Sequence, residues 1–382
     1  MAGNADQELP LVSIVIPVYN GSNFLSQAID SALSQTYPAI EVVVVNDGST
    51  DNGESERAAL SYGNKIHYYL KANGGVASAL NFGIKKMSGE YFSWLSHDDL
   101  YEATKIEEEI AVLLSQPDPA NTVVACNSLT LYENGMKRKD TINQAIFDNY
   151  FNIFLGASAK TGINGCSLLI PRHLLLEAVG FREDLPVTQD YDLWYRLSDD
   201  AQFVLLARHL VTYRHHEMQD SIQKFTMSLM AGDDLRSTIL QHVPAKTFAL
   251  FMDSHKRNKK WIWENYHTYK VRGGIKTPLA ILFLLARYYY DKGGGSTRVQ
   301  SEILAFEQRY GSGSHVQDDA KALYADKALM LIRHISDKDY RAGQDSVTSN
   351  TVLRYLQSVK NDGFLFMAEK AARKIIRMGR RG

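Results

Sequence analysis

The stretch that decides the fold of this chain is "VSIVIPVYNGSNFLSQAIDSALSQ", from Val12 to Gln35. Its first eight residues are mostly apolar and β-branched, a pattern that favours a strand buried on both faces. Apolar residues then recur at helical spacing from Phe24 to Leu33, with Ser22 as a candidate helix cap. A buried strand followed at once by an amphipathic helix predicts the start of a parallel strand–helix–strand unit.

The same alternation continues for about a hundred residues. Further strands are expected at Ile40–Val45, Lys65–Leu70, Glu90–Leu95 and Thr122–Cys126, with helices at about 76–87 and at Ala103–Ser115. The pattern predicts an open α/β fold with a mostly parallel central sheet and right-handed crossovers. Ligands of such sheets bind beyond the carboxyl ends of the strands.

Length and charge divide the chain in two. A chain of 382 residues is longer than one average domain. Residues 241–382 carry 25 Lys and Arg against 13 Asp and Glu, and residues 1–240 carry 17 against 30. We therefore expect an acidic catalytic domain over 1–240 and a basic helical domain over 241–382.

Composition indicates a reducing compartment and no membrane-spanning segment. Cys126 and Cys166 lie in apolar surroundings without metal-ligand spacing, as buried thiols do. The first ten residues lack the basic and apolar regions of a secretory signal. The apolar run Leu279–Ala286 is shorter than the roughly 20 residues that a membrane helix needs. We expect a cytoplasmic protein.

Polar side chains follow four successive predicted strands: Tyr19 and Asn20, then Asn46–Asp51, then Asn73–Gly75, then Ser96–Asp99. The acids Asp98 and Asp99 could cap a helix or could hold a divalent cation, whose preferred ligands are carboxylate oxygens. Asp47 could belong to a tight turn or could accept hydrogen bonds from a base or ribose. One crevice is expected to collect all four groups.

The common phosphate-binding loops are missing from the sequence. No GxGxxG follows the first strand, and no GxxxxGK[ST] occurs anywhere in the chain. A nucleotide diphosphate bound here would need another source of positive charge. Mn²⁺ or Mg²⁺ held by Asp98 and Asp99 would supply it.

Five ordered blocks of sequence carry a resemblance to a known family. They are "SIVIPVYNGSNFLSQAIDSALSQTY", "EVVVVNDGSTD", "NGGVASALNFGI", "GEYFSWLSHDD" and "VTQDYDLWYRL", followed by "YRHH" at Tyr213–His216. Over residues 11 to 220 the chain resembles the family 2 glycosyltransferases of the GT-A fold. That family consists of inverting enzymes that use nucleotide sugars.

The resemblance implies roles for individual residues of the donor site. The predicted nucleotide-binding residues are Pro17, Tyr19, Asp47, Asn73, Gly75, Asn81 and Asp98. Asp98 and Asp99 correspond to the acidic metal-binding element, with Asp99 as the expected direct ligand and His216 completing the metal or diphosphate site. Where the family commonly has another acid, two residues before Asp98, this chain has Ser96.

On the acceptor side, the resemblance makes Asp190 the catalytic base. Inversion is a single displacement, so one carboxylate must take the proton of the attacking hydroxyl. Asp190 could instead cap its helix. Trp194 could offer a platform to a sugar ring or could belong to the core, and Gly165 is expected to line the acceptor pocket or to serve packing.

The end of the chain predicts a basic amphipathic helix over Gly363–Gly382. Such a helix could lie on an anionic membrane surface, and the segment His255–Trp263 adds four cations and two Trp residues. The alternative is a helical packing or homo-oligomerisation domain with a solvated charged face. Nucleic acid is not expected as a partner, because the catalytic part is acidic.

Together these observations predict a metal-dependent inverting glycosyltransferase. Its donor is expected to be a UDP-sugar and its acceptor a glycan or lipid-linked glycan in polysaccharide synthesis. A binding or scaffold protein that kept the fold and lost the chemistry is one alternative, favoured by Ser96 alone. A nucleotidyltransferase is another, although the glycine-rich basic loop of that class is missing after the first strand.

Overall fold

The structure is a computed structural model that describes residues 9–142 and 163–254, except 186, 199, 218, 220–223 and 244, and single positions between 258 and 288. Contacts divide the chain into two units, Met1–Ala231 and Gly232–Gly382, with the boundary inside helix α8. The predicted terminal helix at 363–382 and most of the segment 255–263 lie outside the described residues. No helix within the described residues is long and apolar enough to span a membrane.

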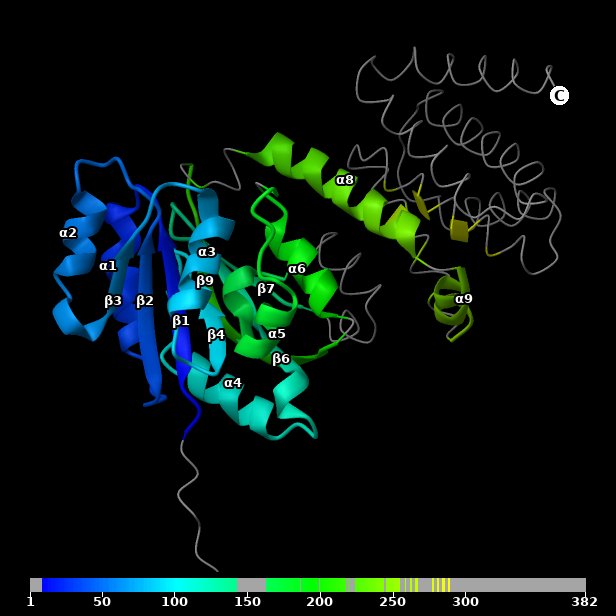
Figure 1. The fold of residues 1–382 in the computed structure, drawn as a ribbon, viewed down its shortest axis with the longest axis horizontal. Helices are drawn as coiled ribbons and strands as arrows, with labels where there is room; N and C mark the ends of the chain where they lie inside the picture. The colour runs from blue at the N-terminus through cyan, green and yellow to red at the C-terminus, as the bar shows by residue number, and fades with distance from the viewer. Residues whose placement is uncertain are drawn as a thin grey trace, which may run out of the picture. The chain divides into compact units, whose positions relative to one another are not determined.

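The first half of the central sheet is parallel, as predicted. Strands β1 (Val12–Val18), β2 (Ile40–Asn46), β3 (His67–Leu70) and β4 (Tyr91–Trp94) lie in the order β3-β2-β1-β4 (Figure 1). All three pairings are parallel. β1 is buried along its whole length, which explains why its sequence is apolar without alternation.

The second half of the sheet is mixed, where the sequence predicted parallel pairing. β8 (Leu168–Pro171) is antiparallel to both β4 and β6 (Thr122–Tyr132), whereas β6 and β9 (Gln202–His215) are parallel. The short strands β5 (Leu100–Tyr101) and β7 (Lys137–Asp140) pair antiparallel with β9 and β6. Strand β8 does not follow a helix at the spacing seen in the first half of the chain, so the strand–helix alternation of the sequence does not predict it.

Helices flank the sheet, and the three helices expected at about 24–33, 76–87 and 103–115 are present within two residues of these bounds. The bounds of the helices are α1 Ser22–Leu33, α2 Glu54–Leu60, α3 Gly75–Lys86, α4 Lys105–Leu114, α5 Arg172–Glu177, α6 Gln189–Leu197, α8 Phe225–His242 and α9 Ala245–Ser254, with single 3₁₀ turns at Gly63–Lys65, Pro119–Asn121 and Gly165–Ser167. The expected Ser22 cap is wrong: Gly21 is the N-cap, and the Ser22 hydroxyl bonds Glu54 instead. Helix α2 was not predicted, because seven residues are too short a span for a periodic signal.

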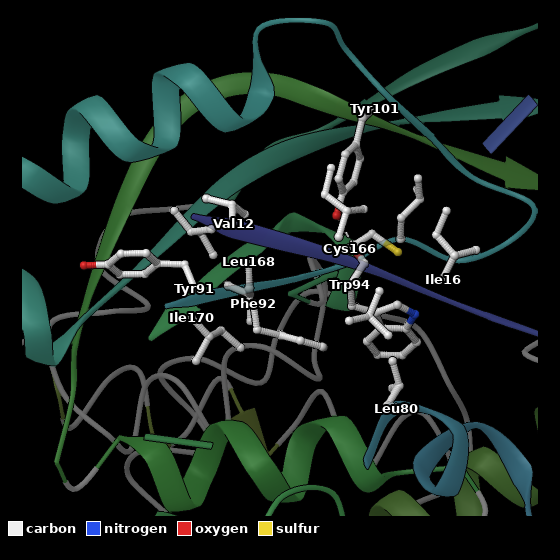
Figure 2. Close-up of a cluster of buried hydrophobic side chains, with 14 of the residues drawn as sticks. Val12, Ile16, Leu80, Tyr91, Phe92, Trp94, Tyr101, Cys166, Leu168 and Ile170 are labelled. Atoms are coloured by element: carbon white, nitrogen blue, oxygen red, sulfur yellow. Dashed lines mark hydrogen bonds between the residues drawn. The ribbon is translucent and has the colours of Figure 1, made fainter. Parts of the chain in front are cut away.

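The core packs both halves of the sheet into one cluster of buried side chains. Figure 2 shows part of it, where Val12 and Ile16 of β1 meet Phe92 and Trp94 of β4 and Leu168 of β8. Burial of these side chains is the main favourable term in folding, at about 1.5–3 kcal/mol for each large one. The rigid cluster holds the ends of the strands in place.

β1 and β4 stop pairing before β1 ends. Their pairing ends at Val15 and Trp94, with one further hydrogen bond from Leu95 N to Val15 O. Pro17 lies just beyond this point, in a central strand that would not otherwise tolerate the loss of an N–H. The strand order runs in opposite directions from β1, and ligands of α/β sheets bind at such switch points.

Candidate active site

Asp47 stands at the end of β2 and is held from three directions. Its Oδ1 accepts from Lys71 Nζ at 2.5 Å and from Gly74 N at 3.1 Å, and its Oδ2 accepts from Gly75 N at 2.7 Å. The N–H groups belong to the start of α3, whose dipole favours a negative charge there. Gly75 has φ +84°, which explains the glycine at this position.

The structure shows what holds Asp47, and its predicted contact with a base or ribose stays a prediction. The side chains of Asp47 and Asn73 and the backbone of Gly75 do meet, and Asn73 Nδ2 donates to Asp47 O at 3.0 Å. Protein donors bond both oxygens of the carboxylate, so Asp47 fixes the start of α3. Sequence reasoning missed Lys71, although the rule that flagged Asn73 applies equally to the residue directly after β3.

Two residues at the end of β1 differ in what they can offer a nucleotide. Pro17 is buried within β1, so its predicted contact with the nucleotide is not supported here. Tyr19 is 46% exposed and leaves a flat aromatic face available for stacking. Asn20 adopts φ 50°, and its amide oxygen accepts from Thr50 N, which ties the end of β1 to the loop after β2.

Asp98 and Asp99 lie in the loop between β4 and β5, and both are buried. Asp98 Oδ2 lies 3.1 Å from His216 Nε2, so the structure joins these two predicted metal residues. Asp99 Oδ1 accepts from Arg214 N at 3.0 Å, and the Cys166 thiol donates to Asp99 Oδ2 at 3.4 Å. Thus Asp98, where Asp99 was the expected direct ligand, is the acid that meets the histidine.

The electrostatics of this pair suit a divalent cation. Burial and then the neighbouring charge of Asp98 raise the pKa of Asp99 well above its ordinary value. Within the described part of the chain, no three His, Cys, Asp or Glu side chains converge into a ready-made cage. A carboxylate and an imidazole at 3.1 Å, with a second acid next to them, nevertheless fit Mn²⁺ or Mg²⁺ if phosphate and water supply the other ligands.

Side chains of helix α1 contact His216 and its neighbour Arg214. The ring of Phe24 lies 5.1 Å from that of His216, and the guanidinium of Arg214 lies 4.7 Å from Phe24. Arg214 also donates to Gln27 Oε1 at 2.6 Å. Phe24 and Gln27 were not predicted, because in the sequence they are simply one turn of an amphipathic helix.

Asp190 and Asp192 occupy the first turn of α6 but have different surroundings. Asp192 is buried and bonds Arg196 at 2.7 Å, with Arg182 at 3.7 Å. Asp190 is partly buried, and its Oδ1 accepts from Tyr191 N. Burial raises the pKa of Asp190 to about 6, because water no longer stabilises its charge. Asp190 is therefore poised to exchange a proton near neutral pH, whereas Asp192 is committed to its arginine.

An aromatic stack anchors α6 beside the end of β4. Phe181 contacts Trp94 edge-on at 6.0 Å and Trp194 edge-on at 6.2 Å. Trp194 is 1% exposed, so the predicted sugar platform is wrong and the core alternative holds. Residues four apart share a helix face, which places Asp190 one turn before Trp194 on the same face of α6.

Gly165 serves packing. A Cβ atom there would lie 2.4 Å from the indole of Trp94, so only glycine permits the close approach of the turn before β8. The next residue, Cys166, is the thiol that reaches Asp99. Gly165 thus sets the position of Cys166 beside the acidic pair and does not itself offer a group to an acceptor.

The side-chain amide of Asn81 bonds both backbone groups of Phe181. Its Oδ1 accepts from Phe181 N and its Nδ2 donates to Phe181 O, both at 2.8 Å, with Glu183 Oε1 at 2.9 Å. Asn81 thus joins α3 to the loop that leads into α6, and its predicted nucleotide contact stays a prediction. Gly180 makes this possible, because a Cβ there would lie 2.4 Å from Asn81 Oδ1.

Comparisons with known proteins show the family of the chain. The profile of "Glycosyl transferase family 2" matches residues 13–172. An uncharacterized glycosyltransferase of Rickettsia typhi is 46% identical over 310 residues, covering 79% of this chain and 92% of that protein. One from Rickettsia felis is 49% identical over 213 residues, covering 56% of this chain but only 35% of that protein. The chain likewise spans about a third of two further Rickettsia relatives.

A solved structure supports the fold. Residues 1–349 of S. aureus TarS, in complex with UDP-GlcNAc, superpose with a TM-score of 0.51 at 16% identity, covering 87% of this chain and 92% of that one. At this identity the likeness concerns the fold alone. It matches the mixed sheet described above and the predicted GT-A architecture.

Proposed function

The chain belongs to glycosyl transferase family 2, and from that premise we propose that it transfers a sugar from a UDP-sugar to a hydroxyl of a glycan, with inversion. The observation that carries the proposal is the acidic pair Asp98–Asp99 beside His216, at the carboxyl end of a parallel sheet. That TarS was crystallised with UDP-GlcNAc supports the choice of a UDP-sugar as donor.

In this proposal the residues divide the work by position. Tyr19 stacks on the base, and the start of α3, fixed by Asp47, borders the same crevice. Asp98, Asp99 and His216 would hold Mn²⁺ or Mg²⁺, which when bound stabilises negative charge on the departing diphosphate. Asp190 takes the proton of the acceptor hydroxyl, a role for which a pKa of about 6 suits it.

The proposal also names an acceptor and a cellular location. We propose a growing glycan, lipid-linked or free, as the acceptor. The net positive charge of residues 241–382 supports a peripheral position on the cytoplasmic face of an anionic membrane. The alternative is that this part mediates assembly of the chain with itself.

Calorimetry with UDP and Mn²⁺ tests the donor site. Wild-type protein should bind UDP only when the cation is present, and Asp99→Ala should weaken that binding at least tenfold, since a buried carboxylate is removed from the cation's surroundings. Asp118→Ala is the matched control, because Asp118 lies in a surface turn, where its carboxylate bonds Asn121 and no other residue of the described part of the chain. Equal UDP affinity with and without the cation would contradict the metal-dependent proposal.

Release of UDP separates the enzyme from a protein that only binds. Incubated with a UDP-sugar, Mn²⁺ and a glycan acceptor, the wild-type chain should release UDP, and the anomeric configuration of the product, read by NMR, should be inverted. Binding of UDP without any release would favour the scaffold alternative.

A further inference from the structure

A buried series of hydrogen bonds links residues at the two ends of the loop that carries Asp98 and Asp99. Lys105 Nζ lies 3.1 Å from Ser93 Oγ, Ser93 Oγ lies 2.7 Å from Tyr101 Oη, and Tyr101 Oη lies 2.7 Å from Trp94 O. Lys105 and Ser93 are fully buried and Tyr101 is 5% exposed. Tyr101 and Trp94 both appear in the core cluster of Figure 2.

The chemistry of the end groups fixes the direction of this series. An ammonium group only donates and a carbonyl only accepts. Lys105 therefore donates to Ser93, and Tyr101 donates to the carbonyl of Trp94. Because this bond uses the single proton of the Tyr101 hydroxyl, Ser93 donates to Tyr101 at 2.7 Å, with Leu168 O at 3.5 Å as a more distant acceptor. Because all donors point the same way, each bond polarises the next, and the charge of Lys105 strengthens the terminal bond to Trp94 O.

Stability alone gives a weak reason to keep this charge in the core. Lys105 Nζ forms an ion pair with Glu109 Oε2 at 2.7 Å, and neither side chain is exposed. Lys105 also lies 4.3 Å from the centroid of the Tyr101 ring. A buried ion pair is often no more stable than apolar residues of the same volume, so its presence calls for a role in specifying local structure.

The hydrogen bond from Tyr101 to Trp94 O specifies the structure of the loop between β4 and β5. Trp94 is the last residue of β4 and Tyr101 belongs to β5, so the bond from Tyr101 to Trp94 O closes the loop Leu95–Asp99 across its two ends. Strand β5 is also paired with β9, with Leu100 opposite Thr212 and Tyr101 opposite Val211. The next residues along β9 reach Arg214, which bonds Asp99, and then His216, which contacts Asp98.

We propose that Tyr101, polarised by Lys105 through Ser93, is a positioning residue that clamps the Leu95–Asp99 loop and sets Asp98 and Asp99 against His216. The clamp is a property of the fold. Its consequence for binding of UDP and the cation rests on the function proposed above.

Tyr101→Phe is the sharpest test, because it removes the hydroxyl and leaves the ring over Lys105. Tyr37→Phe is a matched control: Tyr37 is also 5% exposed, and its hydroxyl also donates to a backbone carbonyl, Pro10 O at 2.8 Å, at the opposite end of the sheet. Hydrogen exchange of the full chain without ligand then measures how often the loop opens. The amides to follow are those of Leu95, Ser96 and Asp99, which are hydrogen-bonded in the structure.

In Tyr101→Phe these three amides should exchange about tenfold faster than in wild type, as expected for the loss of one hydrogen bond, and in Tyr37→Phe they should not change. Ser93→Ala, which interrupts the series one step earlier, should change them in the same direction by a smaller factor. Unchanged loop exchange in Tyr101→Phe, or an equal increase in Tyr37→Phe, would overturn the clamp.

Calorimetry of the same variants with UDP and Mn²⁺ reads the consequence for the site. Tyr101→Phe should weaken binding about tenfold and Tyr37→Phe should not. If wild-type protein fails to bind UDP, the proposed function fails, while the exchange result still decides whether the clamp exists.

Discussion

At the scale of single residues, Asp190 and Asp192 lie in the same turn of α6 but have different surroundings. Asp192 is held by Arg196, whereas the carboxylate of Asp190 is bonded by backbone N–H groups, those of Tyr191 and of Asp190 itself. Two positions apart on a helix, the side chains face in nearly opposite directions. Asp192 therefore faces the arginines and Asp190 faces another side of the helix, which is why Asp192 is structural and Asp190 is the candidate base.

Asp190→Asn should reduce the rate of transfer by at least a hundredfold, because the acceptor proton loses its base. Binding of UDP with Mn²⁺ should be retained, which calorimetry would check. In the wild type, kcat/KM should rise with pH through about 6, as Asp190 loses its proton. An unshifted pH profile, or full activity in the variant, would remove Asp190 from the mechanism.

Asp190 should also change how the free energy of unfolding depends on pH. Its pKa is raised to about 6 in the fold, above the ordinary value of 3.8, so between these pH values the native state binds more protons than the unfolded state. Stability must then fall as pH rises through this window, by about 1–3 kcal/mol. Asp190→Asn should be more stable than wild type at pH 8 and gain less at pH 4.5, measured by urea unfolding. A gain independent of pH would contradict the shift.

At the scale of elements, the donor half and the acceptor half are joined through specific contacts of α3 and α6. Asn81 of α3 holds both backbone groups of Phe181, and Arg196 of α6 donates to Gly180 O at 2.8 Å and also to Ala178 O. These contacts fix Ala178–Phe181, the start of the loop between α5 and α6. That loop leads into α6, which carries Asp190.

Asn81→Ala should lower kcat and leave the KM for the donor nearly unchanged, because the loop before α6 loses its latch. The free energy of unfolding should drop by about 1–3 kcal/mol, since both backbone groups of Phe181 lose their partner. Steady-state kinetics and urea unfolding check the two effects. Asn134→Ala, which removes a bond to Met136 N in an exposed turn, is the control. A raised donor KM with normal kcat would support the nucleotide-binding role.

At the scale of the whole molecule, the chain consists of two units of opposite charge. The similarity to the Rickettsia typhi protein extends over more residues than the first 240, so it continues into the second unit. The predicted basic helix at 363–382 lies outside the described residues and stays a prediction. Its expected partner is an anionic lipid surface.

Changing Lys370, Arg373, Lys374 and Arg377 together to Gln should weaken binding to phosphatidylglycerol vesicles by at least tenfold, because each cation near such a surface contributes about 1 kcal/mol. Co-sedimentation measures the effect. Changing four lysines of the first unit, Lys85, Lys86, Lys137 and Lys139, controls for net charge. Equal sedimentation of both variants would favour the assembly alternative.

The local rules of the sequence determined the first half of the fold. Four buried strands, the helices between them and the polar residues at the strand ends follow from hydrophobic periodicity, which acts within a few residues. They pointed to Asp47, Asp98 and Asp99 at the ends of the strands, whereas His216 and Asp190 were named through the family resemblance. The resemblance supplied their expected roles, and the structure joins Asp98 to His216 as expected.

Only the tertiary structure decided which polar groups are already occupied. Asp47, Asn81 and Trp194 have the residue types and positions of ligand-binding groups, yet partners distant in sequence bond the first two and bury the third. The clamp of Tyr101 is equally invisible in the sequence, because its meaning depends on Trp94 and Ser93 returning beside it. Local pattern specifies elements, whereas hydrogen-bond satisfaction in the interior depends on which elements meet, and that is a property of the folded chain.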